Sequence, residues 1–168
     1  MNRKDTDELR REPQPGEWVT PEEFANVIRL TPLVAIDLIV QSPDGRSLVG
    51  RRLNEPAKGM LFVPGSRISK NERLAAAFTR VTREELGAEV SLVEARFVGV
   101  YEHMYPTNRF ELPGFGTHYI VLAYELRLSL DTAQLPQDQH GEFLWLTPTE
   151  LLANPKVHDN TKAYFKGR

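Results

Sequence analysis

Residues 64–87 read PGSRISKNERLAAAFTRVTREELG, and most of this stretch has the pattern of an amphipathic helix. At about 100° per residue, Phe78 and Val81 lie within about 40° of Leu74, and Glu85 falls between them on the same apolar face. Acidic side chains are seldom fully buried unless they are paired or bind a metal. We therefore expect Glu85 either to lie at a frayed, solvated helix end or to face a cation.

The segments before this helix predict a helix and a hairpin. Thr20, followed by Pro21 and two acidic residues, indicates a helix start, and Pro32 ends that helix. Residues 33–41 are rich in Leu, Val and Ile, with Asp37 as an interruption, and they join residues 47–52 through a Pro-Asp-Gly turn. Residues 1–17 contain few bulky apolar residues and are expected to form a mobile N-terminal tail.

Residues 18–168 are predicted to form a single α/β (α+β) domain. Further strands are expected at residues 59–63, 95–102, 116–128 and 142–146. Pro148 opens a short final helix. This order of elements predicts a mixed β-sheet sandwiched between helices.

Composition excludes several classes of function. Lys and Arg number 21 against 23 acidic residues, so no overall positive field recruits nucleic acid or an anionic membrane. The absence of cysteine removes disulfide and thiolate chemistry. No apolar run approaches about 18 residues, and the first residues lack the apolar core of a secretory signal. We expect a cytoplasmic protein.

The spacing within residues 64–87 resembles the Nudix box, G-x5-E-x7-R-E-U-x-E-E-x-G-U, in which U is a bulky apolar residue. Five positions match in register: Glu72, Arg80, Glu84, Glu85 and Gly87. Three positions differ, because Ser66 replaces the first Gly, Val81 replaces the Glu after the Arg, and Thr82 replaces the apolar residue. The resemblance implies a Nudix fold. The loss of the acid at Val81 implies a metal site with fewer carboxylates.

Two of the matching acids also have ordinary structural interpretations. Ser69 and Glu72 have the spacing of a helix cap, and Glu72 lies on a face nearly opposite Glu85. Glu84 lies four residues after Arg80, which suits a helical ion pair.

The pattern is similar to one branch of the superfamily, the GDP-mannose mannosyl hydrolases, over residues 18–164. The similar segments are TPLVAIDLIV, LFVPGSR, RVTREELG, THYIVL, PQDQH, VHDN and AYF. The loop at residues 104–115 departs from the family pattern, which leaves the choice between mannose and another sugar open.

The resemblance implies a site for Mg²⁺, with Mn²⁺ as a substitute. Its ligands would be the carboxylate of Glu85, the backbone carbonyl of Gly65 and the side-chain amide of Gln139. These are oxygen ligands of the kind that Mg²⁺ prefers.

The resemblance also assigns substrate contacts. Arg52 and Arg67 would bind the pyrophosphate, and His103 and Tyr119 would contact the leaving group. Asp37 would lie near the sugar.

Two aromatic residues are candidates for stacking on the nucleobase. Trp18 and Phe24 offer flat partners of the kind that a base prefers. For Phe24, packing in the core is favoured over stacking on the base.

His140 is the candidate general base. It follows Gln139 in what the sequence indicates is a polar loop, and an unperturbed imidazole, with a pKa of about 6.5, accepts a proton near neutral pH. The resemblance implies that His140 activates water for attack at the anomeric carbon of GDP-mannose, releasing GDP and the sugar with inversion. The rival interpretations are a Nudix pyrophosphatase that cleaves a nucleoside diphosphate sugar at phosphorus and a non-catalytic sugar-nucleotide sensor. The resemblance also implies a homodimer.

Overall fold

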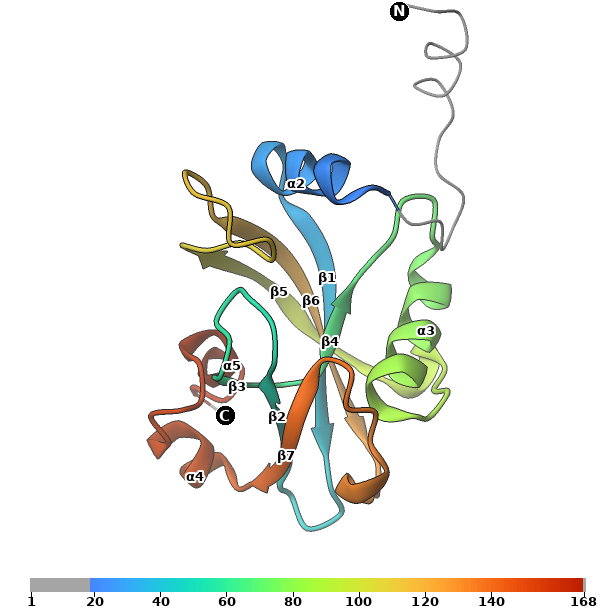
Figure 1. Cartoon of the computed structure of the whole chain (residues 1–168). Helices are drawn as coiled ribbons and strands as arrows, with labels where there is room; N and C mark the ends of the chain where they lie inside the picture. Colours follow the sequence, from blue (N-terminus) through green and yellow to red (C-terminus); the bar gives the residue numbers. More distant parts are fainter. Residues whose placement is uncertain (1–18, 168) are drawn as a thin grey trace, which may run out of the picture.

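The computed structural model describes residues 19–167 and shows a β-sheet with helices packed on both faces (Figure 1). The helices span Pro21–Leu30 (α2), Leu74–Leu86 (α3), Pro148–Ala153 (α4) and Asp159–Ala163 (α5), and single 3-10 turns span Leu92–Glu94 (η1) and Thr132–Gln134 (η2). The strands span Leu33–Gln41 (β1), Ser47–Arg52 (β2), Leu61–Phe62 (β3), Gly65–Arg67 (β4), Arg96–Tyr105 (β5), Thr117–Arg127 (β6) and His140–Leu146 (β7). The predicted tail at residues 1–17 and the predicted stacking residue Trp18 lie outside the described residues.

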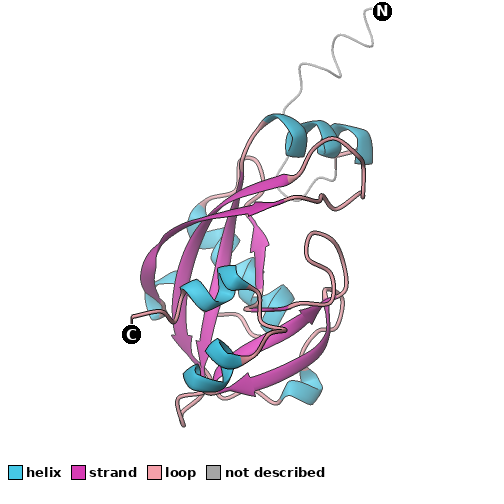
Figure 2. Ribbon diagram, turned by 90° about the vertical axis from the view of Figure 1, so that its left-hand side faces the viewer, coloured by secondary structure: helices cyan, strands magenta, loops and turns pink. Residues whose placement is uncertain are grey.

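The sheet is mixed, as the sequence predicts. Its strands lie in the order β3-β2-β1-β6-β5, while β4 pairs with β1 and β7 pairs with β2. The central strands β1 and β6 run parallel, from Leu33 opposite Tyr119 to Gln41 opposite Arg127. The other pairs of named strands are antiparallel. Figure 2 shows the twist of this sheet and the helices outside it.

Helix α2 begins and ends where local signals place it. The side chain of Thr20 accepts a hydrogen bond from the backbone N–H of Glu23, and the Glu23 carboxylate accepts one from the backbone N–H of Thr20. Pro21 occupies the first turn, where it costs no hydrogen bond. The predicted helix start is confirmed, and so is the hairpin that follows it.

Helix α3 packs its apolar face on one side of the sheet. Ala77, Phe78 and Val81 are fully buried against β1 and β6, and Gly87 ends the helix in the left-handed conformation that glycine favours. The burial of this face confirms the periodicity that identifies the helix in the sequence. It also fixes Glu85 in the last turn, on the side facing the sheet.

The prediction that Ser69 and Glu72 cap this helix is wrong. Helix α3 begins at Leu74 with Arg73 as the N-cap residue, and no side chain caps it. The Glu72 carboxylate does accept a hydrogen bond of 2.9 Å from the Ser69 backbone N–H, but this contact closes a turn that precedes the helix. A capping box and a single turn have the same residue spacing, and in this protein Ser69 and Glu72 form a turn rather than a helix cap.

The opposite face of the sheet is covered by the C-terminal segment. Leu151, Val157, Tyr164 and Phe165 form a buried cluster with residues of β1, β2 and β3. The predicted helix after Thr147 is confirmed as α4, whereas α5 and the three-residue strand β4 are too short to give a periodic pattern and were not predicted. No helix within residues 19–167 is both long and apolar enough to cross a membrane.

Candidate active site

One cavity of about 490 Å³ gathers most of the predicted site residues, which come from segments spread over more than 100 positions of the chain. The walls come from α2, β1, β2, β4, the facing ends of β5 and β6, and the start of β7. The predicted residues that line it are Phe24, Asp37, Arg52, Gly65, Arg67, His103, Tyr119, Gln139 and His140. Glu85 lies immediately behind Gln139 and His140 and does not itself line the cavity.

Glu85 is buried, with 3% of its surface exposed. Its Oε1 accepts a hydrogen bond of 3.0 Å from the Gln139 amide, and its Oε2 lies 3.5 Å from Nδ1 of His140. Within residues 19–167 no Lys or Arg side chain lies within 4 Å of this carboxylate. A frayed, solvated helix end is therefore excluded, and the buried charge has too few partners to compensate it without a further cation.

His140 does not lie in a loop, as its polar neighbours suggested, but is the first residue of β7 and is 5% exposed. It pairs with Arg52 across β2, and its ring packs directly on Gly50. A Cβ at position 50 would lie 2.7 Å from the imidazole carbons, so only glycine leaves room for the ring. Neither ring nitrogen makes a hydrogen bond to another residue in the range 19–167, which leaves the imidazole available to a water or a ligand.

The donor set around Glu85 fits a hard divalent cation. Glu85 offers a carboxylate, the adjacent Gln139 offers a side-chain amide, and Gly65, which lines the same cavity as Gln139, offers a backbone carbonyl. Among residues 19–167 no group of three His, Cys, Asp or Glu side chains is arranged to hold a metal, so the ligands would be one carboxylate with neutral oxygens. The Gln139 amide presents its nitrogen to Glu85, so it would have to turn over to offer its oxygen to a cation.

The space beside Gly65 is closed to any larger residue. A Cβ at this position would lie 2.5 Å from Oδ1 of Asp37 and from the backbone carbonyl of Ile36. This close approach brings the backbone of β4 against the acidic part of the cavity. It explains why the Pro-Gly pair stands at this point of the sequence.

The remaining acids of the box are neutralised by one arginine. Arg80 forms ion pairs of 2.7 Å with Glu72 and 2.8 Å with Glu84, and the hydrogen bonds from Arg80 lower the pKa of Glu72. The predicted ion pair between Glu84 and Arg80 is confirmed. Arg80 also donates a hydrogen bond of 2.8 Å to the backbone carbonyl of Arg67, so it ties the helix to β4.

Asp37 and His103 meet through a third residue. Oη of Tyr164 donates a hydrogen bond of 2.6 Å to Asp37 and lies 3.2 Å from Nε2 of His103. Burial raises the pKa of Asp37 to about 6, although the hydrogen bond from Tyr164 and the charge of Arg52 oppose that shift. Burial lowers the pKa of His103 to about 4, with a smaller effect from His158.

The two predicted phosphate-binding arginines reach the cavity over aromatic rings. Cζ of Arg67 lies 4.0 Å above the ring of Phe24, and Cζ of Arg52 lies 5.3 Å from the centre of Phe62. Stacking uses the face of a guanidinium and leaves its in-plane N–H donors free for a phosphate. Phe24 is half-buried and lines the cavity, so the core-packing interpretation is wrong for this residue.

A model of the NUDIX domain matches residues 31–166. The chain belongs to the NUDIX family. It is 36% identical over 152 residues to the low-salt glycan biosynthesis protein Agl8 of Haloferax volcanii, covering 90% of this chain and 94% of that protein.

Solved NUDIX structures share the fold. The MutT protein from Methanosarcina mazei Go1 aligns with a TM-score of 0.64 and 18% identity, over 82% of this chain and 93% of that one. The MutT NUDIX hydrolase from Burkholderia pseudomallei aligns with a TM-score of 0.62 and 24% identity, over 81% and 97%. The NUDIX domain of NrtR from Shewanella oneidensis, in complex with ADP ribose, aligns with a TM-score of 0.59 and 16% identity, over 87% and 95%.

This NUDIX domain contains site residues that sequence reasoning missed. Tyr164 belongs to the AYF segment, but that pattern assigns no partner to its hydroxyl. The box pairs Arg80 with Glu84 but not with Glu72 or with the backbone carbonyl of Arg67. Arg109 and Phe110 line the cavity from the loop between β5 and β6, where the sequence departs from the family pattern and gives no motif to follow. Only the packing of that loop against α2 reveals them.

Proposed function

We propose that this NUDIX hydrolase splits GDP-mannose into GDP and mannose by water attack at the anomeric carbon. The observation that carries the proposal is the position of His140, which lies 3.5 Å from Glu85, the acid of the box that Arg80 does not engage, and has no hydrogen bond on its ring within residues 19–167. Such an imidazole can accept a proton from a water molecule in the cavity. By contrast, Glu72 and Glu84 are engaged by Arg80.

The proposed reaction is a displacement at the anomeric carbon with inversion of configuration. His140 takes one proton from water while the water oxygen forms a bond to the anomeric carbon on the face opposite the phosphate. The bond between this carbon and the phosphate oxygen breaks, and its electron pair remains on GDP. Arg52 and Arg67, which line the cavity, stabilise the negative charge that develops on the departing phosphate. The sugar leaves as β-mannose.

The residues at the inner end would hold Mg²⁺, or Mn²⁺ in its place, through Glu85, Gln139 and Gly65. Such a cation neutralises charge on a pyrophosphate and so makes GDP a better leaving group. Asp37 lies at the same end of the cavity, where it accepts a hydrogen bond from Tyr164 and can also accept one from a sugar hydroxyl.

Two comparisons are compatible with a nucleotide-sugar substrate. The relative from Haloferax volcanii is named for glycan biosynthesis, and nucleotide sugars are activated donors of sugar units. The NrtR NUDIX domain holds ADP ribose, which is also a nucleoside diphosphate joined to a sugar.

A pyrophosphatase is the second candidate, because Glu84 lines the cavity while paired with Arg80. If a substrate phosphate bound Arg80 in place of Glu84, the Glu84 carboxylate would be released and could serve with Glu85 as a second metal ligand. That reaction would release GMP and mannose 1-phosphate.

Hydrolysis in ¹⁸O-labelled water separates these reactions. We expect the label on the sugar hydroxyl, unlabelled GDP and β-mannose as the first sugar formed. Label in a phosphate, or GMP as the nucleotide product, would establish the pyrophosphatase. Tight binding without turnover, tested with GDP-mannose, GDP-glucose and ADP-glucose, would instead indicate a sensor.

We also propose a homodimer in solution. Phe97, Val100 and Met104 are half or more exposed on β5, which is an edge strand of the sheet. Light scattering coupled to gel filtration should give twice the chain mass of 19.1 kDa, and the single mass would refute the proposal.

A further inference from the structure

A third arginine reaches the cavity beside Arg52 and Arg67. Arg109 lines the wall from the loop between β5 and β6, and the resemblance assigns it no role. All three arginines line the same cavity as Tyr119; burial raises the pKa of Tyr119, and the positive charges of the three arginines oppose that shift. Burial lowers the pKa of Arg67, and the charge of Arg109 lowers it further.

In the part of the chain from 19 to 167, none of the three arginines forms an ion pair with a carboxylate within 4 Å. Like charges that gather on one wall repel one another, and a polyanionic ligand relieves that repulsion. The wall therefore favours a ligand with more than one negative charge.

The loop that carries Arg109 is held in place by Asn108, which is completely buried. Its amide nitrogen donates to the carbonyls of Leu112 and Phe115 at 2.8 and 2.9 Å. Its amide oxygen accepts from the backbone N–H groups of Phe110 and Leu112 at 3.1 and 3.2 Å. Because one side chain satisfies four backbone groups, the loop is fixed, and Arg109 starts from a preset position at the cavity.

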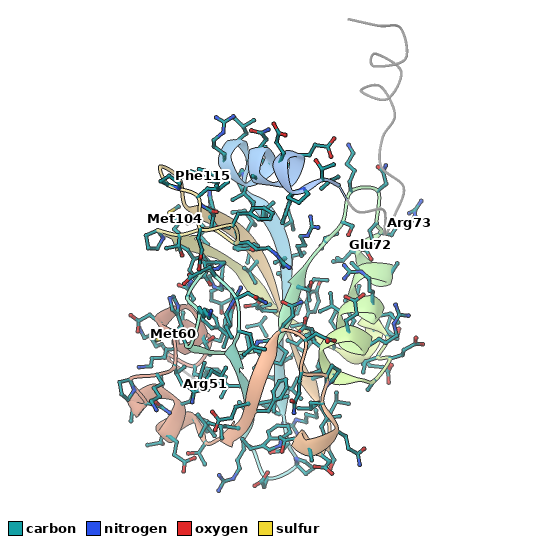
Figure 3. All side chains as sticks on the ribbon, viewed as in Figure 1. Arg51, Met60, Glu72, Arg73, Met104 and Phe115 are labelled. Carbon is teal, nitrogen blue, oxygen red and sulfur yellow. The ribbon has the colours of Figure 1, made fainter. Side chains whose placement is uncertain are left out.

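The same loop contributes an aromatic wall. Phe110 meets Phe24 of α2 edge to face, with ring centres 5.9 Å apart, and Arg67 covers Phe24 from 4.0 Å. Figure 3 labels Phe115 and Met104 on this side of the molecule, next to α2. The loop is also joined to the segment after β2 by a hydrogen bond of 2.8 Å from Thr107 to Glu55.

The cavity thus has two ends of different chemistry. At the inner end lie Asp37 and His140, with Glu85 directly behind His140, and a neutral sugar and a cation suit these acids. At the outer end lie Arg109 and Phe110, where cationic and aromatic side chains suit a nucleotide.

We propose that Arg109 is a substrate-binding residue that contacts the nucleotide half of the substrate, with Phe110 and Phe24 bordering the same half. This inference rests on the proposed function in one respect, namely that the ligand is a nucleoside diphosphate sugar. It assigns the orientation of that ligand: the nucleotide lies against the loop, and the sugar lies against His140.

Calorimetric binding of GDP and of mannose 1-phosphate tests the orientation, with Mg²⁺ present. Arg109→Ala should raise the Kd for GDP by about 10- to 100-fold, the range for loss of a hydrogen bond to a charged group, and Arg109→Lys should raise it less. The Kd for mannose 1-phosphate should change less than about twofold, because Arg109 is not expected to contact the end of the cavity that binds the sugar. In turnover, KM should rise while kcat changes little.

Arg73 provides the matched control. It is exposed at the start of α3, does not line the cavity, and points into solvent (Figure 3). Arg73→Ala should leave both affinities unchanged. An Arg109→Ala variant that binds GDP as well as the parent chain, or that loses both ligands equally, would overturn the inference. A parent chain that binds no GDP would instead defeat the proposed function.

Discussion

The hydroxyl of Tyr164 lies 2.6 Å from the carboxylate of Asp37, across 127 positions of the chain, and 3.2 Å from the imidazole of His103. The three side chains come from the C-terminal segment, β1 and β5, so one buried hydroxyl joins three segments that are distant in the sequence. A Tyr hydroxyl has a single proton, and the short distance indicates that it is donated to Asp37. His103 then donates from Nε2 to the Tyr164 oxygen.

Removing this hydroxyl should destabilise the protein. Tyr164→Phe retains the ring packing but leaves the buried Asp37 carboxylate without its donor, and we expect a loss of about 1–3 kcal/mol in the free energy of unfolding. Urea denaturation measures it. Tyr101→Phe is the control, because Tyr101 packs on Tyr164 with ring centres 4.6 Å apart but makes no side-chain hydrogen bond within residues 19–167. Equal losses in the two variants would show that packing, not the hydrogen bond, is responsible.

The opposite pKa shifts of Asp37 and His103 predict opposite effects of pH on stability. Burial raises the pKa of Asp37 from 3.8 to about 6, so between these values the native state binds more protons than the unfolded state, and this contribution to stability is lost as pH rises. Burial lowers the pKa of His103 from 6.5 to about 4, so the native state binds fewer protons, and this contribution is lost as pH falls.

Single variants should separate the two contributions. Between pH 4 and 6, stability should rise more steeply with pH in Asp37→Asn than in the parent chain, and less steeply in His103→Gln. Urea denaturation across this range, in EDTA to keep cations away from the site, measures both slopes. A change of slope in the same direction for the two variants would contradict the assignment.

The space between Gly50 and His140 offers a test that leaves every polar site residue intact. Gly50→Ala would place a methyl group 2.7 Å from the imidazole carbons, so the ring must move. A small displacement of a catalytic group can cost on the order of 100-fold, and we expect a fall in kcat of about that size with the fold preserved. Gly141→Ala is the control, because its Cβ would approach closely only a terminal carbon of Leu53, a flexible side chain that is 41% exposed. Similar kcat values for the two variants would remove His140 from the reaction.

Glu85 and Glu84 are adjacent in sequence but differ in environment. Glu85 is buried behind Gln139, whereas Glu84 is ion-paired to Arg80 on a more exposed face of the helix. Activity should require a divalent cation, and Glu85→Gln should lower kcat by about 100-fold or more because it removes the one carboxylate ligand. Glu84→Gln should have a much smaller effect. Titration of both variants with Mg²⁺ and Mn²⁺ measures the difference, and equal losses would show that the site uses more than one carboxylate.

Local patterns in the sequence were enough to predict most of the fold. The helix start at Thr20, the apolar period around Phe78 and the turn after Gln41 each involve residues within a few positions of one another, and all are confirmed. The position of Glu85 on the apolar face followed from the same period. Because burial of one helix face is set by spacing alone, this site residue could be identified without any knowledge of its partners.

Contacts between distant segments could not be predicted in this way. The polar residues before His140 indicated a loop, whereas pairing with Arg52 across β2 makes it the start of a buried strand. The role of Tyr164 depends on Asp37 in β1, and the role of Arg109 depends on its proximity to Arg52 and Arg67. These partners lie far away in the sequence. A pattern read along the chain does not contain such pairings, since they are decided by how the sheet and its loops pack.

His140 as general base predicts the form of the pH–rate profile. The rate should rise with pH while the imidazole loses its proton and then level, because only the neutral ring can accept a proton from water. His140→Gln should lose about 10²- to 10⁴-fold in kcat, the usual contribution of a general base, while the Kd for GDP stays nearly constant. The acidic limb of the profile should disappear in the variant. If the variant retains the same acidic limb, the proton is accepted elsewhere, and Asp37, whose pKa burial raises to about 6, becomes the base to test next with Asp37→Asn.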